Sequence, residues 1–230
     1  MKVLGIDTSA IVCSVALVSD KTLASGTVSD GLTHSETLLP LIKEVLRQGN
    51  TPLSELSGVA VSHGPGSFTG LRIGISAVKG LTVSQRIPCI GVSTLEALAM
   101  NGVSYEGFVI CPVMDARRGE FYNALFRVDG KKLVRLCEDR AISGNDLASE
   151  LSSFENVLIL GDGAEKFIQQ NSTFANRIAP EEIRYQSGES VARLGLASLN
   201  NGEFLNCKEL SPRYLRLPQA EREWNERNKK

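Results

Sequence analysis

The sequence predicts an α/β fold made of two copies of a β-β-β-α-β-α unit, each built on a mixed sheet. Three strand patterns open the chain, helix and strand patterns then alternate, and the same order begins again after residue 102. A length of 230 residues with 42% hydrophobic residues is enough for two packed cores. We therefore expect one subdomain over residues 1–102 and a second over 103–230.

In the first unit, five apolar runs bounded by turn residues predict strands, and helical spacing predicts the helices. The expected strands cover 2–8, 12–19, 22–29, 59–62 and 88–92. The expected helices cover 34–47, 68–86 and 93–100, and a short extra turn covers 53–56. Ser93 and Glu96 have the spacing of a capping box, which supports the start of the third helix.

The second unit repeats this order less regularly. Its expected strands cover 108–114, 120–128, 132–136 and 157–160, and its expected helices cover 143–151 and 187–199. Residues 224–230 are polar and are expected to fray at the end of the second subdomain.

The composition predicts a soluble, cytoplasmic protein without a bulk positive charge for nucleic acid. The 25 lysines and arginines oppose 26 aspartates and glutamates, so the net charge is −1. Asp7 interrupts the N-terminal apolar run, and no apolar run reaches the roughly 18 residues of a membrane span. The five cysteines form no C-x-x-C pair and are expected to be reduced and mostly buried: Cys13, Cys89, Cys111, Cys137 and Cys207.

A carboxylate closes the first expected strand of each unit, Asp7 in the first and Asp115 in the second. Actin-like ATPases and sugar kinases place an acid there to hold a magnesium-bound water. An ordinary polar turn also explains Asp7, and Arg117 and Arg118 stand where a phosphate loop needs small residues. The stretch 161–164 follows a strand where actin-like folds often hold adenosine. An ATP-binding or ATP-hydrolysing enzyme that uses Asp7 and Asp115 is therefore the alternative function.

Residues 64–74 form the most distinctive stretch, rich in glycine and placed between a strand and a helix. It matches neither the P-loop nor the G-x-S-x-G pattern, although a phosphate-binding helix start stays open. The helix that follows carries small residues on one face, namely Gly70, Gly74, Ala77 and Gly80. It carries bulky apolar residues on another, namely Phe68, Leu71, Ile75, Val78 and Leu81. Such a helix packs on two sides, and one of those contacts can be another chain.

Histidine and cysteine supply no recognisable catalytic set. The two histidines, His34 and His63, form neither an H-x-x-x-H nor an H-E-x-x-H pair, so a metallopeptidase lacks its ligands. The spacing leaves a Cys–His pair open, but nothing in the sequence selects one.

Six segments together resemble the bacterial TsaB family, also called YeaZ. They are IDTS at 6–9, HSETLLP at 34–40, GPGSFTGLRIG at 64–74, GVSTL at 91–95, DARRGE at 115–120 and YLR at 214–216. The resemblance implies an actin-like fold of the acetate kinase/Hsp70/actin type with two duplicated subdomains. It also implies a subunit of the machinery that forms N6-threonylcarbamoyladenosine at position 37 of tRNA, whose catalytic subunit is the paralogous TsaD.

One departure from TsaD shapes the expected role. TsaD-like proteins carry an H-x-x-x-H metal pair on the helix after a Gly-Val-Asn motif, and the matching positions here are Thr94 and Leu98. Neither side chain can replace an imidazole on a transition metal. The resemblance therefore implies a non-catalytic scaffold that binds and activates TsaD, with no catalytic residue, no metal site and no peptidase activity.

The resemblance also implies the partners. We expect a heterodimer with TsaD, a ternary complex with TsaE, a homodimer when the chain is alone, and tRNA contact only through the complex. The chain itself requires no cofactor, and ATP with magnesium acts at the level of the complex. The expected partner interface lies on the two long helices of the first unit and comprises His34, Leu38, Leu39, Phe68, Leu71, Arg72, Gly74, Ile75, Ala77 and Val78. Direct tRNA contact has only local candidates, Arg117, Arg118 and residues 213–230, and interleaved glutamates predict that this last segment is merely solvated.

Overall fold

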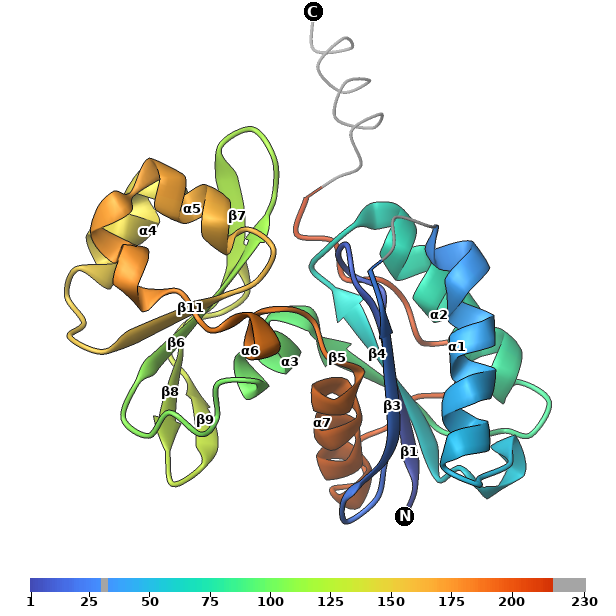
Figure 1. The fold of residues 1–230 in the computed structure, drawn as a ribbon. Coiled ribbons are helices and arrows are strands. Elements are labelled where there is room, and N and C mark those ends of the chain that lie inside the picture. Colours follow the sequence, from blue (N-terminus) through green and yellow to red (C-terminus); the bar gives the residue numbers. More distant parts are fainter. Residues whose placement is uncertain (30–32, 217–230) are drawn as a thin grey trace, which may run out of the picture.

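The computed structural model describes residues 1–29 and 33–216, which form two sheets lying side by side (Figure 1). The first sheet has the strand order β3-β2-β1-β4-β5. Its strands are β1 (Val3–Asp7), β2 (Cys13–Val18), β3 (Thr22–Val28), β4 (Gly58–Gly64) and β5 (Cys89–Ser93). The first three strands form an antiparallel meander, and β4 and β5 add in parallel. The predicted mixed sheet is therefore confirmed.

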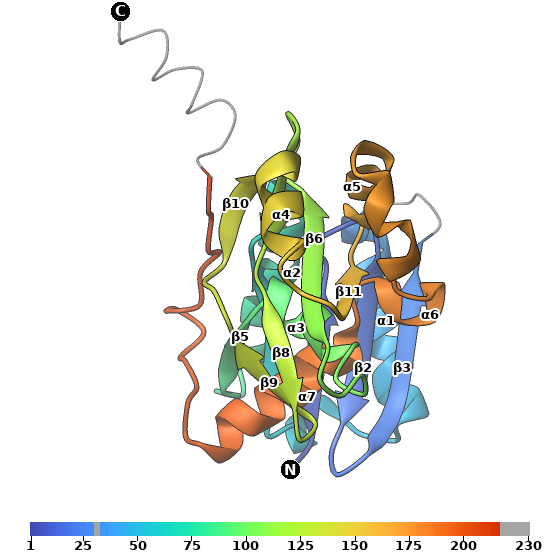
Figure 2. The same ribbon diagram turned by 90° about the vertical axis from the view of Figure 1, so that its left-hand side faces the viewer.

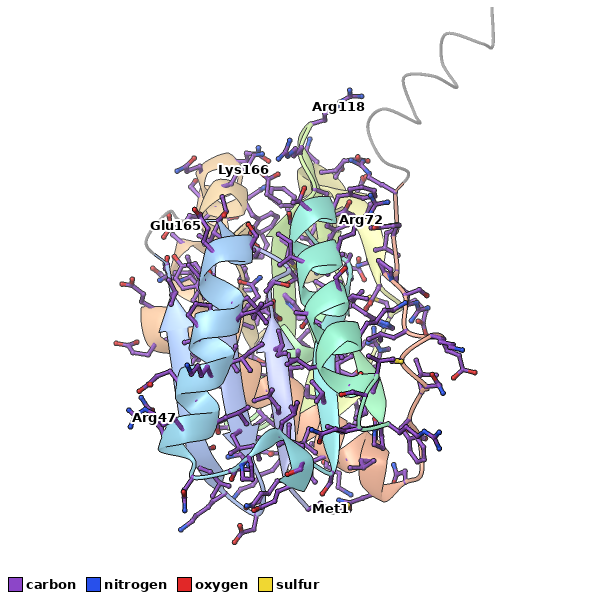
Figure 3. The ribbon with its side chains drawn as sticks, turned by 90° about the vertical axis from the view of Figure 1, so that its right-hand side faces the viewer. Met1, Arg47, Arg72, Arg118, Glu165 and Lys166 are labelled. Atoms are coloured by element: carbon purple, nitrogen blue, oxygen red, sulfur yellow. The ribbon has the colours of Figure 1, made fainter. Side chains whose placement is uncertain are left out.

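Helices cover both faces of the first sheet. α1 (His34–Gln48) and α2 (Phe68–Thr82) lie side by side on one face (Figure 3), and α7 (Gly188–Asn200) packs against β1, β2 and β4 on the other. The approach of α7 is close because Gly5 and Gly188 meet, and a Cβ on Gly5 would overlap the Gly188 carbonyl. The expected division at residue 102 therefore separates the two sheets but does not describe α7, which returns from the second part of the chain to the first sheet.

The second sheet repeats the first. Its strands are β6 (Val109–Asp115), β7 (Glu120–Asn123), β8 (Phe126–Asp129), β9 (Lys132–Arg135), β10 (Arg140–Ser143) and β11 (Val157–Leu160). β6 pairs antiparallel with β7 and β8 and parallel with β11, just as β1 pairs antiparallel with β2 and parallel with β4. α4 (Gly144–Leu151) and α5 (Ala164–Gln170) follow in the order of α1 and α2. The predicted duplication is thus present in the strand pairing itself.

The single strand predicted at 120–128 is wrong, because the structure divides it into β7 and β8. Pro112 of β6 stands opposite the break, between two stretches of pairing, and has no N–H to donate. The Asn123 side-chain amide donates to the Pro112 carbonyl at 2.9 Å instead. The strand that corresponds to β3 is divided as well, because β9 pairs with β8 and β10 pairs with β7. The sequence pattern predicts β9 but not β10.

Helix ends differ from the sequence pattern in a few places. The helix predicted at 68–86 ends at Thr82, since the Ile87 amide closes a turn onto the Thr82 carbonyl at 3.2 Å and Arg86 has a left-handed φ of 53°. The short turn predicted at 53–56 is confirmed by a 3-10 turn at Leu53–Glu55. Three short elements had no periodic pattern to reveal them: α5, α6 (Glu181–Arg184) and the 3-10 turn Ser172–Arg177.

α3 (Thr94–Met100) joins the subdomains, because Leu95 and Leu98 pack in one cluster with Ile110 and Met114 of β6. The Ser93 side chain accepts the Glu96 amide, which is one half of the expected capping box, whereas the Glu96 carboxylate pairs with Arg135. All five cysteines are free, and Cys13, Cys89 and Cys111 are buried. Within residues 1–29 and 33–216, no helix combines the length and the apolar character that crossing a membrane requires. The predicted fraying end at 224–230 lies outside the described residues.

Candidate functional site

A cleft of about 640 Å³ opens between the two subdomains at one end of the molecule. Its walls are the loops that follow β1, β4 and β6, together with Asp162 and residues 213–216. The loops after β1 and β6 are the equivalent loops of the two duplicated units. This is where the sequence placed a candidate nucleotide site, so its residues decide whether a magnesium nucleotide fits.

Asp7 is buried at the end of β1 and does not line the cleft. Its Oδ1 accepts the Ser9 amide at 2.8 Å and the Ser9 hydroxyl at 2.6 Å, and its Oδ2 accepts the Ser62 hydroxyl. Burial raises the pKa of Asp7, and the hydrogen bonds from Ser62 and Ser9 oppose that shift. The side chain of Asp7 therefore joins the turn after β1 to the neighbouring strand β4. This agrees with the ordinary polar turn that the sequence allowed in place of a magnesium site.

Asp115 does line the cleft, but its carboxylate is already paired with the ammonium group of Lys166. Lys166 of α5 contacts both carboxylate oxygens at 2.9 Å, and the Arg117 amide donates to one of them at 2.8 Å. Arg117 and Arg118 both adopt left-handed backbone angles, with φ of 64° and 56°. Because Asp7 is enclosed and Asp115 is paired, the residues present do not fit a magnesium nucleotide held as in actin-like ATPases.

Asp162 is the second acid in the lining of the cleft, beside Asp115. Burial raises its pKa to about 6, and the Gln186 side chain approaches its Oδ1 at 3.5 Å. The sequence pointed to this residue only as part of the stretch 161–164. The side chain that contacts Asp162, Gln186, lies 24 residues further along the chain, and no local sequence pattern indicates that contact.

The segment 213–216, which we call the latch, ties the two subdomains together across the cleft mouth. The Arg213 amide donates to the His63 carbonyl at 2.7 Å, and the Tyr214 ring stacks on Phe68 at 4.6 Å between centroids. On the other subdomain, Arg216 donates to the Ala116 carbonyl at 3.1 Å and pairs with Glu120. Figure 2 shows the chain running from α7 along the outer side of β5 to reach this position. In the sequence, residues 214–216 stand out only as a motif shared with a family, and nothing there indicates that they bridge the two subdomains.

Tyr214→Ala should release the latch. The variant loses the stacked ring pair and the hydrogen bond that Arg72 donates to the Tyr214 hydroxyl at 3.0 Å, which together contribute on the order of 1 kcal/mol. We expect the protection of the Arg213 amide against hydrogen exchange to fall about tenfold. Tyr214→Phe keeps the stack and should retain most of the protection. Wild-type protection in Tyr214→Ala would show that the latch is held by other contacts.

The predicted partner interface needs correction, because half of its residues belong to the core of this chain. Leu38, Leu71, Gly74, Ile75 and Val78 are buried beneath α1 and α2 and cannot touch a partner. Gly70 and Gly74 of the small-residue side also face inward, since a Cβ on either would overlap Thr8. His34 is half-buried, and its Nε2 donates to the Ala10 carbonyl at 2.7 Å. Leu39 and Arg72 are exposed, and Phe68 and Ala77 are half-buried.

The outward side of the two helices nevertheless carries exposed apolar and small residues among its polar ones. Leu39 of α1 is 55% exposed, and Val83, just after α2, is 57% exposed. Apart from its two chain neighbours and the nearby backbone of α2, no atom of residues 1–29 or 33–216 lies within 4 Å of where a Cβ on Gly80 would stand. We call this surface the helix face, and it comprises Leu39, Pro40, Ser76, Ala77, Gly80 and Val83.

The positions that match the TsaD metal pair are both packed inside the protein. Thr94 and Leu98 are 0% and 1% exposed, and Leu98 lies in the cluster that joins the subdomains. The Thr94 hydroxyl has no hydrogen-bond partner among the described residues. The helix that carries the ligands in TsaD-like proteins therefore serves here as a packing element.

Comparison with known proteins places the chain in a family. A family model described as "TsaD: tRNA N6-adenosine threonylcarbamoyltransferase" matches residues 31–224. The chain is 31% identical to the tRNA threonylcarbamoyladenosine biosynthesis protein TsaB of Bacillus subtilis (strain 168), with all of both chains covered. The chain belongs to the TsaB family. The Escherichia coli (strain K12) TsaB is 29% identical, with 94% of this chain and 95% of that protein covered.

The actin-like fold that the TsaB family resemblance implied is also confirmed. The solved structure of YeaZ from Pseudomonas aeruginosa superposes with a TM-score of 0.76 at 24% identity. The superposition covers 93% of this chain and 100% of that one. The duplicated α/β architecture is therefore common to this TsaB family member and to YeaZ.

Proposed function

We propose that the chain acts in the biosynthesis of N6-threonylcarbamoyladenosine in tRNA, as a non-catalytic subunit that binds and activates TsaD. Two relatives matched over nearly their whole length carry the name of this biosynthesis, and the matching family model carries the name of the transferase. The docking role depends on one observation, the helix face, where apolar and small residues stay exposed on helices that already bury their inner sides.

The helix face suits close packing against another helix pair. Gly80 and Ala77 let a partner backbone approach, Val83 supplies apolar area just after the end of α2, and Leu39 supplies more on α1. A subunit without a catalytic group changes a distant active site only by binding one of its conformations more tightly than another. Activation of TsaD by this chain is then a consequence of docking, and a second copy occupies the same face as a homodimer when TsaD is absent.

The remaining components belong to the complex. We propose that the chain needs no cofactor of its own, that ATP and magnesium act in the assembled complex with TsaD and TsaE, and that assembly takes place in the cytoplasm. The alternative, an enzyme that binds or hydrolyses ATP, has the cleft in its favour. The state of its two acids argues against it. Asp7 is hydrogen-bonded to Ser9 and Ser62, and Asp115 is paired with Lys166, so neither carboxylate is available for magnesium.

Gly80→Arg tests the docking role. A charged, bulky side chain on the helix face should weaken binding of TsaD at least a hundredfold, on the order of 3 kcal/mol. The fold should survive, because Gly80 is exposed with open space around it and arginine is a better helix former than glycine. Calorimetric titration of purified TsaD into the variant measures the affinity, and thermal melting measures the fold.

Ala197→Arg is the matched control, since Ala197 is an exposed position on α7, which covers the opposite face of the same sheet. It should bind TsaD as the wild type does. In reconstituted tRNA modification, Gly80→Arg should lose activity while Ala197→Arg keeps it. A folded Gly80→Arg chain with wild-type affinity for TsaD would overturn the proposal.

A further inference from the structure

Four arginines at the cleft have no acidic partner among residues 1–29 and 33–216. Arg117 and Arg213 line it, Arg118 follows Arg117 in the same loop, and Arg72 donates to Tyr214 of the lining. We call them the arginine rim, and all four are exposed. Two of the three nearby acids are already paired, since Lys166 pairs with Asp115 and Arg216 pairs with Glu120. The third, Asp162, lines the cleft and contacts Gln186, and its one charge does not balance four arginines. The rim therefore carries an excess of positive charge, although the whole chain has a net charge of −1.

The loop after β6 holds two of these arginines in place. Arg117 and Arg118 have left-handed φ angles of 64° and 56°, which favour glycine or asparagine over arginine. The loop is fixed at its base, where Asp115 accepts the Arg117 amide at 2.8 Å. Figure 3 shows Arg118 at the tip of the molecule and Arg72 at the same end. The loop thus presents two guanidinium groups to solvent from a defined turn.

An aromatic stack completes the rim. Phe68 and Tyr214 stack at 4.6 Å, and the Arg72 guanidinium lies 3.8 Å from the centre of the Phe68 ring. Tyr214 is 37% exposed. Guanidinium groups bind phosphates through two parallel hydrogen bonds, and flat rings or guanidinium planes stack on unpaired bases. Arginines and a part-exposed ring around one opening are therefore suited to single-stranded or looped RNA.

We propose that the arginine rim binds the phosphate backbone of tRNA directly, at an unpaired loop whose bases reach the Tyr214 ring. The identity of this RNA rests on the proposed function, whereas the polyanion chemistry rests on the rim alone. The neutral composition predicted contact through the complex only, because an average over 230 residues does not reveal a local excess of charge. Arg72 lies one helical turn before Ser76 on α2, so the rim adjoins the helix face there, whereas Arg117 and Arg118 lie on the loop after β6 in the second subdomain. A change confined to Arg117 and Arg118 therefore leaves the helix face intact.

The double variant Arg117→Gln/Arg118→Gln tests the rim. Binding of an unmodified tRNA transcript is measured by fluorescence anisotropy between 50 and 200 mM salt, with the full chain alone and with the chain assembled with TsaD. We expect the variant to bind about tenfold more weakly, and the slope of log K against log salt to fall by about 1 to 2, because two phosphate contacts are lost. Affinity for TsaD, measured by calorimetry, should not change.

The control is Lys131→Gln/Lys132→Gln, an exposed basic pair in a turn with a similar left-handed φ of 61° at Lys131. That turn joins β8 and β9 at the opposite end of the second sheet (Figure 1), so its loss should leave the slope unchanged. Equal tRNA affinity and salt slope for the rim variant and the wild type would overturn the proposal. A fall in TsaD affinity instead would assign the rim to an acidic protein surface and overturn it as well. Failure of the proposed function gives a different result, because calorimetry then shows no binding of TsaD to the wild-type chain. The anisotropy titration of tRNA with the chain alone still tests the rim in that case.

Discussion

A Gly74→Arg chain is expected to fail to fold, with a loss of stability above about 4 kcal/mol. Gly74 lies on the inner side of α2, where a Cβ would overlap the Thr8 hydroxyl and lie 3.3 Å from the Val61 side chain. Thr8 cannot move aside freely, because it is fully buried and donates to the Gly70 carbonyl at 2.8 Å. Arginine would also bury a charge without a partner. Soluble yield and the urea midpoint measure the effect.

Gly80→Arg is the matched control, because it makes the same substitution further along the same helix at an open position. It should keep at least the wild-type midpoint. Gly74→Ala keeps the test quantitative if the arginine variant gives no soluble protein, since one added methyl group should cost about 1–3 kcal/mol. A wild-type midpoint for Gly74→Ala would show that this side of α2 tolerates a Cβ.

These glycines illustrate what helical spacing can predict. The spacing places Gly70, Gly74, Ala77 and Gly80 on one side of α2, apart from the bulky residues, but in the structure Gly70 and Gly74 are buried on the inner side together with the bulky ones. It does not reveal that the row is divided, with Gly70 and Gly74 against Thr8 and Gly80 facing open space. Periodicity orients residues within one helix, whereas the closest neighbour depends on strands elsewhere in the chain.

Element order was predictable for a related reason. Apolar runs and turn residues are local, so the strands and long helices follow from the sequence within a few residues. The break between β7 and β8 is not local, because it depends on Pro112 of the neighbouring strand β6, which stands opposite the break. The place of α7 depends on Gly5 meeting Gly188. Both are contacts between distant parts of the chain.

The candidate site shows the same limit. The sequence correctly located Asp7 and Asp115 at the ends of equivalent strands, because strand ends are local features. It could not assign their chemistry, since the partners that occupy them come from β4 and α5, through Ser62 and Lys166. A carboxylate at a strand end acquires its role from the groups that surround it, which only the fold brings together.

Asp162→Asn is expected to raise the free energy of unfolding at pH 7 by on the order of 3 kcal/mol. Burial raises the pKa of Asp162 from 3.8 to about 6, Gln186 opposes the shift, and the charge of Asp115 adds to it. Because the folded pKa is the higher one, the unfolded chain releases its proton first as the pH rises. The wild type therefore loses stability between about pH 4 and pH 6. Asparagine does not titrate, so the variant avoids this loss.

The dependence on pH separates ionisation from a second effect of the substitution. Gln186 Oε1 is buried and has no hydrogen-bond partner among the described residues, and the side-chain amide introduced by Asp162→Asn can donate to it. That gain is the same at every pH. Urea denaturation at pH 4 and pH 7 should give a difference between variant and wild type that is small at pH 4 and large at pH 7. An equal difference at both values would assign the stabilisation to the amide contact and contradict the raised pKa of Asp162.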